Sequence, residues 1–464
     1  MASGSESECY PGRAATAGAS SHAAYAAALH MLHAGQGDPM ATIERALRHD
    51  PWFADGHCLR AALLVMRARD DARPELARTL QALRNLPPAR LSPRAQRHLD
   101  AAQAWLDHRL QRSLRLYARI VEEDPFDSLA LRVAHFGDLQ WGRQRELRDR
   151  VAAALAHWDE SMPFYGHLLA MLSFGLVENG EYEAALETGR RALRHVPDNA
   201  GAIHAIAHVM EMQGRAREGI EWLRSTRRVW EASASYAAHL WWHLALRHID
   251  AGEPHEALRI YDGKIASFEG AGALVDCSGL LWRLELAGHA LGDRWQRLAD
   301  RWERLALGGM RPFIDAHAML AFAASGRRAS ARRLMDAMRD YARQSGELEA
   351  IVASSALPVC EALWSFGSGD YARAADQLEA LRHLADGCGG SRAQCDLRAL
   401  TLLEANRRCG RMRRARALAA ERLVRRPGSG FDQRLYASLA GSAESTSVTG
   451  RHPAADSDAL PTAA

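Results

Sequence analysis

A glycine-led segment recurs at a fixed interval in the middle of the chain. The segment GEYEAA begins at Gly180, and the similar segment GRAREG begins at Gly214, 34 residues later. This is the length of a tetratricopeptide repeat, in which two antiparallel helices form one unit. Because such a unit cannot bury its apolar face alone, neighbouring units must stack on it. The interval therefore predicts an all-α fold, a right-handed α-solenoid of tetratricopeptide-type helical hairpins.

The residues around these glycines have the spacing of paired helices. Leu169, Leu172 and Leu176 recur on one face of the first helix of the clearest unit. Ala185 and Ala192 follow on its second helix. Small side chains at these two places allow neighbouring helices to approach closely, as stacked repeats require.

Further units follow the same pattern. One begins near Ala200, and another near Ala238 with its turn at Gly252, which lies 38 residues after Gly214. We therefore expect about seven or eight hairpins, several of them degenerate. Weaker copies place their turns at Gly326, Gly369 and Gly410.

The two ends of the chain differ in composition from the middle. Residues 1–20 and 441–464 are rich in small and polar residues without periodicity, which predicts disorder. Between them, helical patterns alternate with Gly, Pro or Asp-Pro. We expect residues 21–440 to form a single tetratricopeptide-repeat solenoid.

Composition limits the kinds of partner. A net charge of +3 over 464 residues argues against nucleic acid. We find no apolar run long enough for a membrane span and no secretory signal, so no membrane partner is expected. The seven cysteines are irregularly spaced without a Cys-x-x-Cys pair, which favours a reducing compartment. The predicted location is cytoplasmic.

Candidate functional residues lie on the first helices of two adjacent units. His204, His208 and Glu211 have the spacing i, i+4, i+7 and form one stripe on a helix. On the next first helix, His239 and Trp242 occupy positions that face the concave surface in this repeat class, and His243 follows one turn after His239. These side chains are expected to meet in one groove.

Three interpretations of the stripe remain open. The histidines can be packed helix-interface residues, and this is favoured for His243. They can line a groove for a peptide or a small acidic molecule, with Trp242 providing a flat apolar contact. They can also hold a metal ion, with His204, His208, Glu211, His239 and His243 as candidate ligands. No other cofactor is indicated.

A second, weaker candidate is the pair Asp315 and His317, which could add groove or metal ligands or merely cap a helix. The sequence lacks a Gly-x-Ser-x-Gly elbow, a phosphate-binding loop and the His-Glu-x-x-His motif. No motif therefore names a reaction.

Several short blocks resemble one known family. They occur in order over roughly residues 25–435, and resemble the tetratricopeptide repeat protein 38 family. The resemblance implies an all-helical repeat protein without an established activity, and it implies that His204, His208, His243, Asp315 and His317 belong to the family's pattern. The blocks are Ser173–Leu176, His204–His208 with Glu211 and Met212, Trp242-His243 with Ala245 and Leu246, Ala257-Leu258 with Tyr261 and Asp262, Asp315–His317, Leu357–Cys360, and Gly389–Ser391 with Ala393 and Gln394.

These observations favour a tetratricopeptide-repeat protein that binds a protein segment or small molecule in its concave groove. His204, His208, Glu211, His239, Trp242, Asp315 and His317 are the predicted contacts. The alternative is a metal-dependent hydrolase or oxidase. In that case the histidines would be ligands, and Glu211 a ligand or general base.

Overall fold

The computed structural model describes residues 18–67, 72–305, 307–308, 311–344, 346–382 and 389–441. The elements in these residues are all helical. The first part of the chain forms α1 (Ala19–Ala34), α2 (Pro39–His49), α3 (Ala54–Arg67), α4 (Arg73–Arg84), η3 (Pro88–Arg90), α5 (Pro93–Leu106), α6 (Leu110–Glu123), α7 (Ser128–Gln140), α8 (Gln144–Leu155), α9 (Tyr165–Glu178), α10 (Tyr182–His195), α11 (Ala200–Met212), α12 (Ala216–Ser225) and α13 (Arg227–Trp230).

The second part of the chain continues in the same way, and η5 is a short π-helical segment. It forms α14 (Ala237–Asp250), α15 (Pro254–Gly263), η4 (Ile265–Ser267), α16 (Ala271–Leu286), α17 (Arg294–Trp302), α18 (Pro312–Ala324), α19 (Arg328–Ala342), α20 (Glu347–Ile351), η5 (Val352–Ala356), α21 (Leu357–Gly367), α22 (Tyr371–Ala380), α23 (Arg392–Arg408), α24 (Met412–Arg425) and α25 (Gly430–Gly441).

The helices pack as consecutive hairpins, which confirms the predicted fold class. Over the described ranges there are eleven such pairs: α1/α2, α3/α4, α5/α6, α7/α8, α9/α10, α11/α12, α14/α15, α16/α17, α18/α19, α21/α22 and α23/α24. The expected seven or eight was therefore too low. The pairs α7/α8 and α16/α17 were not recognised, although Gly142 (φ 65°) and Gly288 (φ 85°) stand at their turns; in the turn between α5 and α6, His108 adopts the left-handed conformation (φ 60°) instead of a glycine.

The repeated glycines end the first helix of each clear hairpin. Gly180 follows α9 with φ 85°, and Gly214 follows α11 with φ 71°. This region of φ is readily accessible only to glycine. At Gly214 a second constraint applies, since a Cβ atom would clash with the backbone nitrogen of Ser429.

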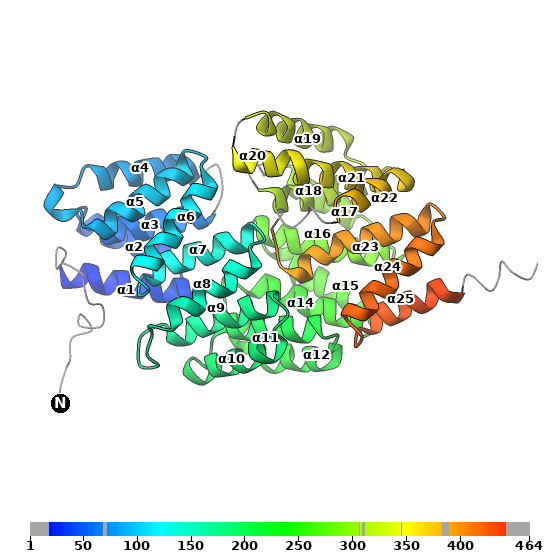
Figure 1. Ribbon diagram of the computed structural model, residues 1–464, viewed down its shortest axis with the longest axis horizontal. Coiled ribbons are helices and arrows are strands. Elements are labelled where there is room, and N and C mark those ends of the chain that lie inside the picture. The colour runs from blue at the N-terminus through cyan, green and yellow to red at the C-terminus, as the bar shows by residue number, and fades with distance from the viewer. Residues whose placement is uncertain are drawn as a thin grey trace, which may run out of the picture.

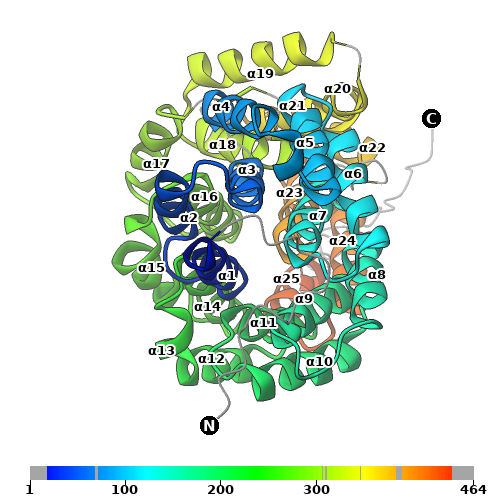
Figure 2. The ribbon, with the colours of Figure 1, turned by 90° about the vertical axis from the view of Figure 1, so that its left-hand side faces the viewer.

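The hairpins follow one another along a continuous coil (Figure 1). In the view of Figure 2 the helices project as a ring, and α1, which lies at the left-hand end in Figure 1, is seen within its outline. His33 of α1 stacks on Phe164, with ring centroids 4.7 Å apart. The Oγ of Ser233 donates to the carbonyl oxygen of Gly35 at 2.8 Å, so the end of α1 also touches the loop before α14.

The C-terminal hairpins pack back onto the middle of the coil. Helix α23 lies against α11 and α16, and α25 lies against α14. The indole of Trp282 donates to the Oγ1 of Thr401 at 2.9 Å, and the Oγ of Ser429 donates to Asp250 at 2.6 Å. The inner faces of α11, α14 and α16 are therefore partly covered by the protein's own helices.

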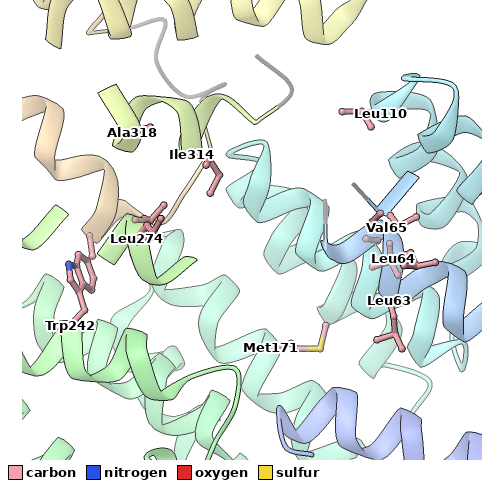
Figure 3. Packing of buried hydrophobic residues seen from close by; sticks show 14 of the residues in the cluster. Leu63, Leu64, Val65, Leu110, Met171, Trp242, Leu274, Ile314 and Ala318 are labelled. Atoms are coloured by element: carbon pink, nitrogen blue, oxygen red, sulfur yellow. The ribbon is translucent and has the colours of Figure 1, made fainter. Parts of the chain in front are cut away.

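A large hydrophobic core runs through most of the hairpins. Figure 3 shows part of it, with Leu63 and Leu64 on α3, Met171 on α9, Trp242 on α14 and Leu274 on α16. Burial of this kind stabilises by about 25 cal/mol per Å² of apolar surface. It fixes the neighbouring helices firmly enough to position side chains between them.

One helical segment corrects an expectation of the sequence analysis. Leu348–Gly367, which spans α20, η5 and α21, is long and apolar enough to cross a membrane by length and composition alone. Half of it is buried inside the protein, where α21 packs on α18 and α22. A helix covered on several sides by other helices is apolar for that reason.

The predicted terminal segments fall almost entirely outside the described residues. Of 1–20 and 441–464, only residues 18–20 and 441 are described, and α1 begins at Ala19. The assignment of 21–440 to a single solenoid stays a prediction.

Candidate metal centre

Two adjacent inner helices each carry a pair of histidines one turn apart. Helix α11 begins after Asn199, whose side chain accepts a hydrogen bond from the Ala202 amide at 3.1 Å. This cap fixes the start of α11 and thereby the face that presents His204 and His208. His239 and His243 have the same spacing on α14.

The four imidazoles converge on one point. One ring nitrogen of each of His204, His208, His239 and His243 lies within 4.8 Å of the other three. The Nε2 atoms of His204 and His208 are only 3.0 Å apart. The stripes of two helices thus form a compact cluster, hereafter the four-histidine group.

Two carboxylates form hydrogen bonds with rings of the four-histidine group. The Nδ1 of His239 is 2.8 Å from the Oδ1 of Asp276 on α16. The Nδ1 of His243 is 2.9 Å from the Oε2 of Glu211 on α11, whose other oxygen accepts from Arg247 at 3.0 Å. Each hydrogen bond engages the Nδ1 of its ring and leaves Nε2 as the nitrogen available to a metal ion, and carboxylates orient metal-binding histidines in this way.

A third carboxylate lies behind His208. The Oε1 of Glu178 is 3.5 Å from the Nδ1 of His208, which is too long for a strong hydrogen bond. The other oxygen of Glu178 accepts from the backbone amide of Arg392 at 2.8 Å. Burial raises the pKa of Glu178 to about 7, although the Arg392 amide and charge oppose this shift.

The group is almost completely enclosed. The side chains of His208 and His243 are 0% and 1% exposed, whereas that of His239 is 20% exposed. Phe174 forms an apolar wall, with its ring 5.3 Å from His204 and 5.2 Å from His208. Among His208, His239 and His243, His239 is the most exposed to solvent.

Burial keeps most of the group uncharged. It lowers the pKa of His204, His208 and His243 well below the ordinary value, and the neighbouring imidazoles lower it further. Burial also disfavours charge on His239, but Asp276 outweighs this effect and raises its pKa. Neutral imidazole is the form that binds a metal ion.

The arrangement fits a transition-metal ion. Bonds of about 2.0–2.1 Å from zinc to nitrogen place the nitrogens of a tetrahedral site about 3.4 Å apart. The nitrogens of the group, with one pair at 3.0 Å and all within 4.8 Å, need only small movements to reach that spacing. The buried Nε2 of His243 has no hydrogen-bond partner among the described residues, and a metal ion would supply one.

Two of the residues predicted as groove contacts, Glu211 and Trp242, pack against histidines of the four-histidine group. Glu211 is 3% exposed, forms a hydrogen bond with the Nδ1 of His243, and lines a small cavity of about 30 Å³ together with Arg247. Trp242 is buried and stacks on the ring of His239 at 5.0 Å, so it contributes packing instead of a ligand surface. Neighbouring helices cover this part of the predicted groove, since α9 and α16 flank α11 and α14, and α23 packs on α11 and α16.

Asp315 and His317 do not join the four-histidine group. Both are buried on α18, which packs against α16, α17, α19 and α21. The Nδ1 of His317 lies 2.8 Å from the carbonyl oxygen of Phe313, one turn earlier on the helix. This local hydrogen bond orients the ring within α18. His317 also lines a separate small pocket of about 40 Å³, and the role of both residues as groove contacts stays a prediction.

Sequence reasoning missed the two carboxylates Glu178 and Asp276. Both stand on first helices of neighbouring hairpins, at the end of α9 and within α16. Asp276 follows His239 by 37 residues, close to the local repeat length of 38, so adjacent inner helices could have been searched for partners at that offset.

The chain is an all-helical repeat protein by its architecture. No family model matches the sequence, so the resemblance to the tetratricopeptide repeat protein 38 family stays a prediction. A solved structure described as "Structure of Naa15/Naa10 bound to HypK-THB" is similar over 90% of this chain, with 11% sequence identity and a TM-score of 0.25. The similar region covers 65% of that chain, slightly less than two thirds of its length.

Proposed function

We propose that the protein binds one divalent transition-metal ion through His204, His208, His239 and His243. The observation that carries this proposal is the convergence of four ring nitrogens within 4.8 Å, from two helices, in a nearly closed space. Burial keeps three of the four imidazoles neutral and leaves the group little access to water, so a metal ion would supply a partner to ring nitrogens that otherwise lack one.

The donor set indicates which ions fit. Imidazole nitrogens suit zinc, copper, iron and nickel, whereas magnesium and calcium require oxygen ligands. The supporting carboxylates make their histidines stronger ligands and fix their orientation. We expect zinc to bind tightly under conditions where it is the available ion.

The ion would join two consecutive hairpins, because α11 and α14 each supply two ligands. Such a link stabilises the folded chain by RT ln(1 + [metal]/Kd), about 2.7 kcal/mol at a free metal concentration one hundred times Kd. The metal-dependent enzyme foreseen from the sequence is a second proposal. The partly exposed His239 supports it, because catalysis needs a ligand position that solvent or substrate can reach.

The helical scaffold supports a further, less specific proposal. Inner faces of helical repeats bind protein segments or small molecules, and we propose such a partner for this chain. The thiols of Cys277 and Cys409, which are not in disulfides among the described residues, support a reducing, cytoplasmic location. Membership of the tetratricopeptide repeat protein 38 family is proposed on the sequence blocks alone.

Metal stoichiometry tests the main proposal. Full-length protein, stripped of metal and reconstituted with Zn²⁺ or Co²⁺, should retain about one ion per chain after desalting. Bound Co²⁺ should show a visible spectrum typical of nitrogen ligands, which also distinguishes a closed four-coordinate site from an open one.

The matched variants separate this site from adventitious binding. His204→Gln/His208→Gln should lose the ion, whereas His157→Gln/His255→Gln should retain it, because His157 and His255 are exposed and outside the group. Circular dichroism checks that both variants are folded. Wild-type protein without stoichiometric metal, or equal loss in both variants, contradicts the proposal.

A further inference from the structure

A pocket of about 460 Å³ lies between α22, α23 and α24. Its volume is within the range of small-molecule sites. Met212 of α11 and Val359 of α21 complete its wall, so the pocket forms where the C-terminal hairpins pack back onto the coil.

One side of this pocket is strongly basic. It is lined by six arginines and a single carboxylate, that of Asp396. This excess contrasts with the nearly neutral charge of the whole chain. The arginines are Arg382, Arg392, Arg398, Arg422, Arg425 and Arg426.

Some of these arginines have structural partners. Arg422 donates to both oxygens of Asp396, at 2.5 Å and 3.0 Å, and also to Asp432 at 2.8 Å. Arg426 pairs with Asp432 at 2.8 Å, and Arg382 pairs with Glu379 and Glu421. These contacts fix the inner part of the basic wall.

Arg392 and Arg425 differ from them. Both are exposed at the rim, and neither forms an ion pair with a carboxylate among the described residues. The Nε of Arg425 reaches only the carbonyl oxygen of Glu421, at 3.4 Å. Two guanidinium groups thus remain available to an anion, beside paired ones that already hold their geometry.

The opposite side of the pocket is apolar. Leu378 and Leu381 from the α22 end, Leu402 from α23 and Leu418 from α24 line it. All four are buried. An inorganic ion would satisfy the arginines but leave this surface uncovered.

We propose that this pocket binds a small organic anion, with a phosphate or carboxylate group at Arg392 and Arg425 and an apolar body against the leucines. Guanidinium groups bind both kinds of oxyanion through paired N–H donors. The inference stands independently of the metal proposal, because none of the four histidines lines the pocket.

Isothermal titration of the full-length protein at low ionic strength tests the inference. Phenyl phosphate and phenylacetate represent the two head groups, and benzyl alcohol is the neutral comparison. At least one of the two anions should bind more tightly than the alcohol, and its binding should weaken as salt is raised. The stronger anion identifies the preferred head group.

Charge-neutral variants locate the binding. Arg392→Gln/Arg425→Gln should raise the Kd of that anion at least about tenfold, since one lost charge-assisted hydrogen bond already corresponds to about that factor. Arg328→Gln/Arg413→Gln removes the same charge from exposed positions outside the pocket and should change Kd less than about twofold. The first variant keeps the Arg392 backbone amide that holds Glu178.

Several results would overturn the inference: absence of binding by both anions, equally tight binding of the alcohol, or similar losses in the two double variants. Both variants are folded if their circular dichroism matches the wild type. Metal content measured on the same samples shows whether a loss of anion binding is separate from the four-histidine group.

Discussion

The clearest quantitative consequence of the four-histidine group concerns Asp276, which does not itself touch the centre. Its Oδ1 accepts from the Nδ1 of His239 at 2.8 Å, and its side chain is only 4% exposed. Asparagine can accept the same hydrogen bond without the negative charge. Asp276→Asn therefore isolates the electrostatic part of the support, while Asp276→Ala removes the acceptor as well.

The expected size of the effect follows from this contact. A hydrogen bond to a charged group contributes about 1.5–3 kcal/mol, against about 0.5–1.5 kcal/mol for a neutral one. The midpoints of these ranges differ by roughly 1.25 kcal/mol, which corresponds to about an eightfold weaker affinity for zinc in Asp276→Asn. Asp276→Ala should be weaker again, within the 10- to 100-fold range known for lost supporting ligands.

Competition with a chromophoric chelator measures these Kd values directly. Asp340→Asn and Asp340→Ala serve as controls. Asp340 is an exposed carboxylate, and within the described part of the chain it pairs only with Arg343, three residues later along the chain. If both Asp276 variants bind zinc within twofold of the wild type, His239 is not a supported ligand and the assignment of the group fails.

Three further predictions concern stability, measured by urea unfolding followed by circular dichroism. Burial lowers the pKa of His135 to about 3, so His135 stays neutral in the folded protein, whereas in the unfolded chain it takes up a proton below about pH 6.5. Its contribution to the free energy of unfolding is therefore present above that pH and lost on acidification. Between pH 6 and pH 5, His135→Gln should lose about 1 kcal/mol less of its free energy of unfolding than the wild type, and an unchanged pH dependence would refute the assignment. Gly214→Ala should lower the free energy of unfolding by about 1–3 kcal/mol more than Gly326→Ala does. Both glycines have positive φ, but only at Gly214 would a Cβ atom lie against Ser429, so an equal decrease in the two variants would show that this contact is unimportant. Ser429→Ala should lower the free energy of unfolding by about 1–3 kcal/mol, because it removes a buried donor to Asp250; an unchanged value would mean that α25 does not hold the coil closed through this bond.

The clear repeats illustrate how much a local pattern can predict. The starts expected near Ala200 and Ala238 agree with α11 at Ala200 and α14 at Ala237. Ala185 and Ala192 are fully buried, as close helix packing requires. The pattern was incomplete for the pairs α7/α8 and α16/α17, which were not recognised although Gly142 and Gly288 stand at their turns with positive φ.

For the candidate site, too, the sequence predicted the local arrangement of the histidines but not the roles of the residues that pack against them. Spacing on a single helix was sufficient to pair His204 with His208 and His239 with His243, since residues four apart share a face. The roles of Glu211 and Trp242 depended on what packs behind them. Both are buried, and one supports His243 while the other stacks on His239.

By itself, the sequence determined the helical hairpins and the faces on which their histidines lie, because both follow from short-range periodicity and turn geometry. Only the tertiary structure decided that four imidazoles share one buried centre, that Asp276 and Glu211 orient two of them, and that C-terminal helices cover the inner face. These features depend on contacts between residues tens to hundreds of positions apart, such as Thr401 with Trp282, and such contacts are set by how the coil closes on itself.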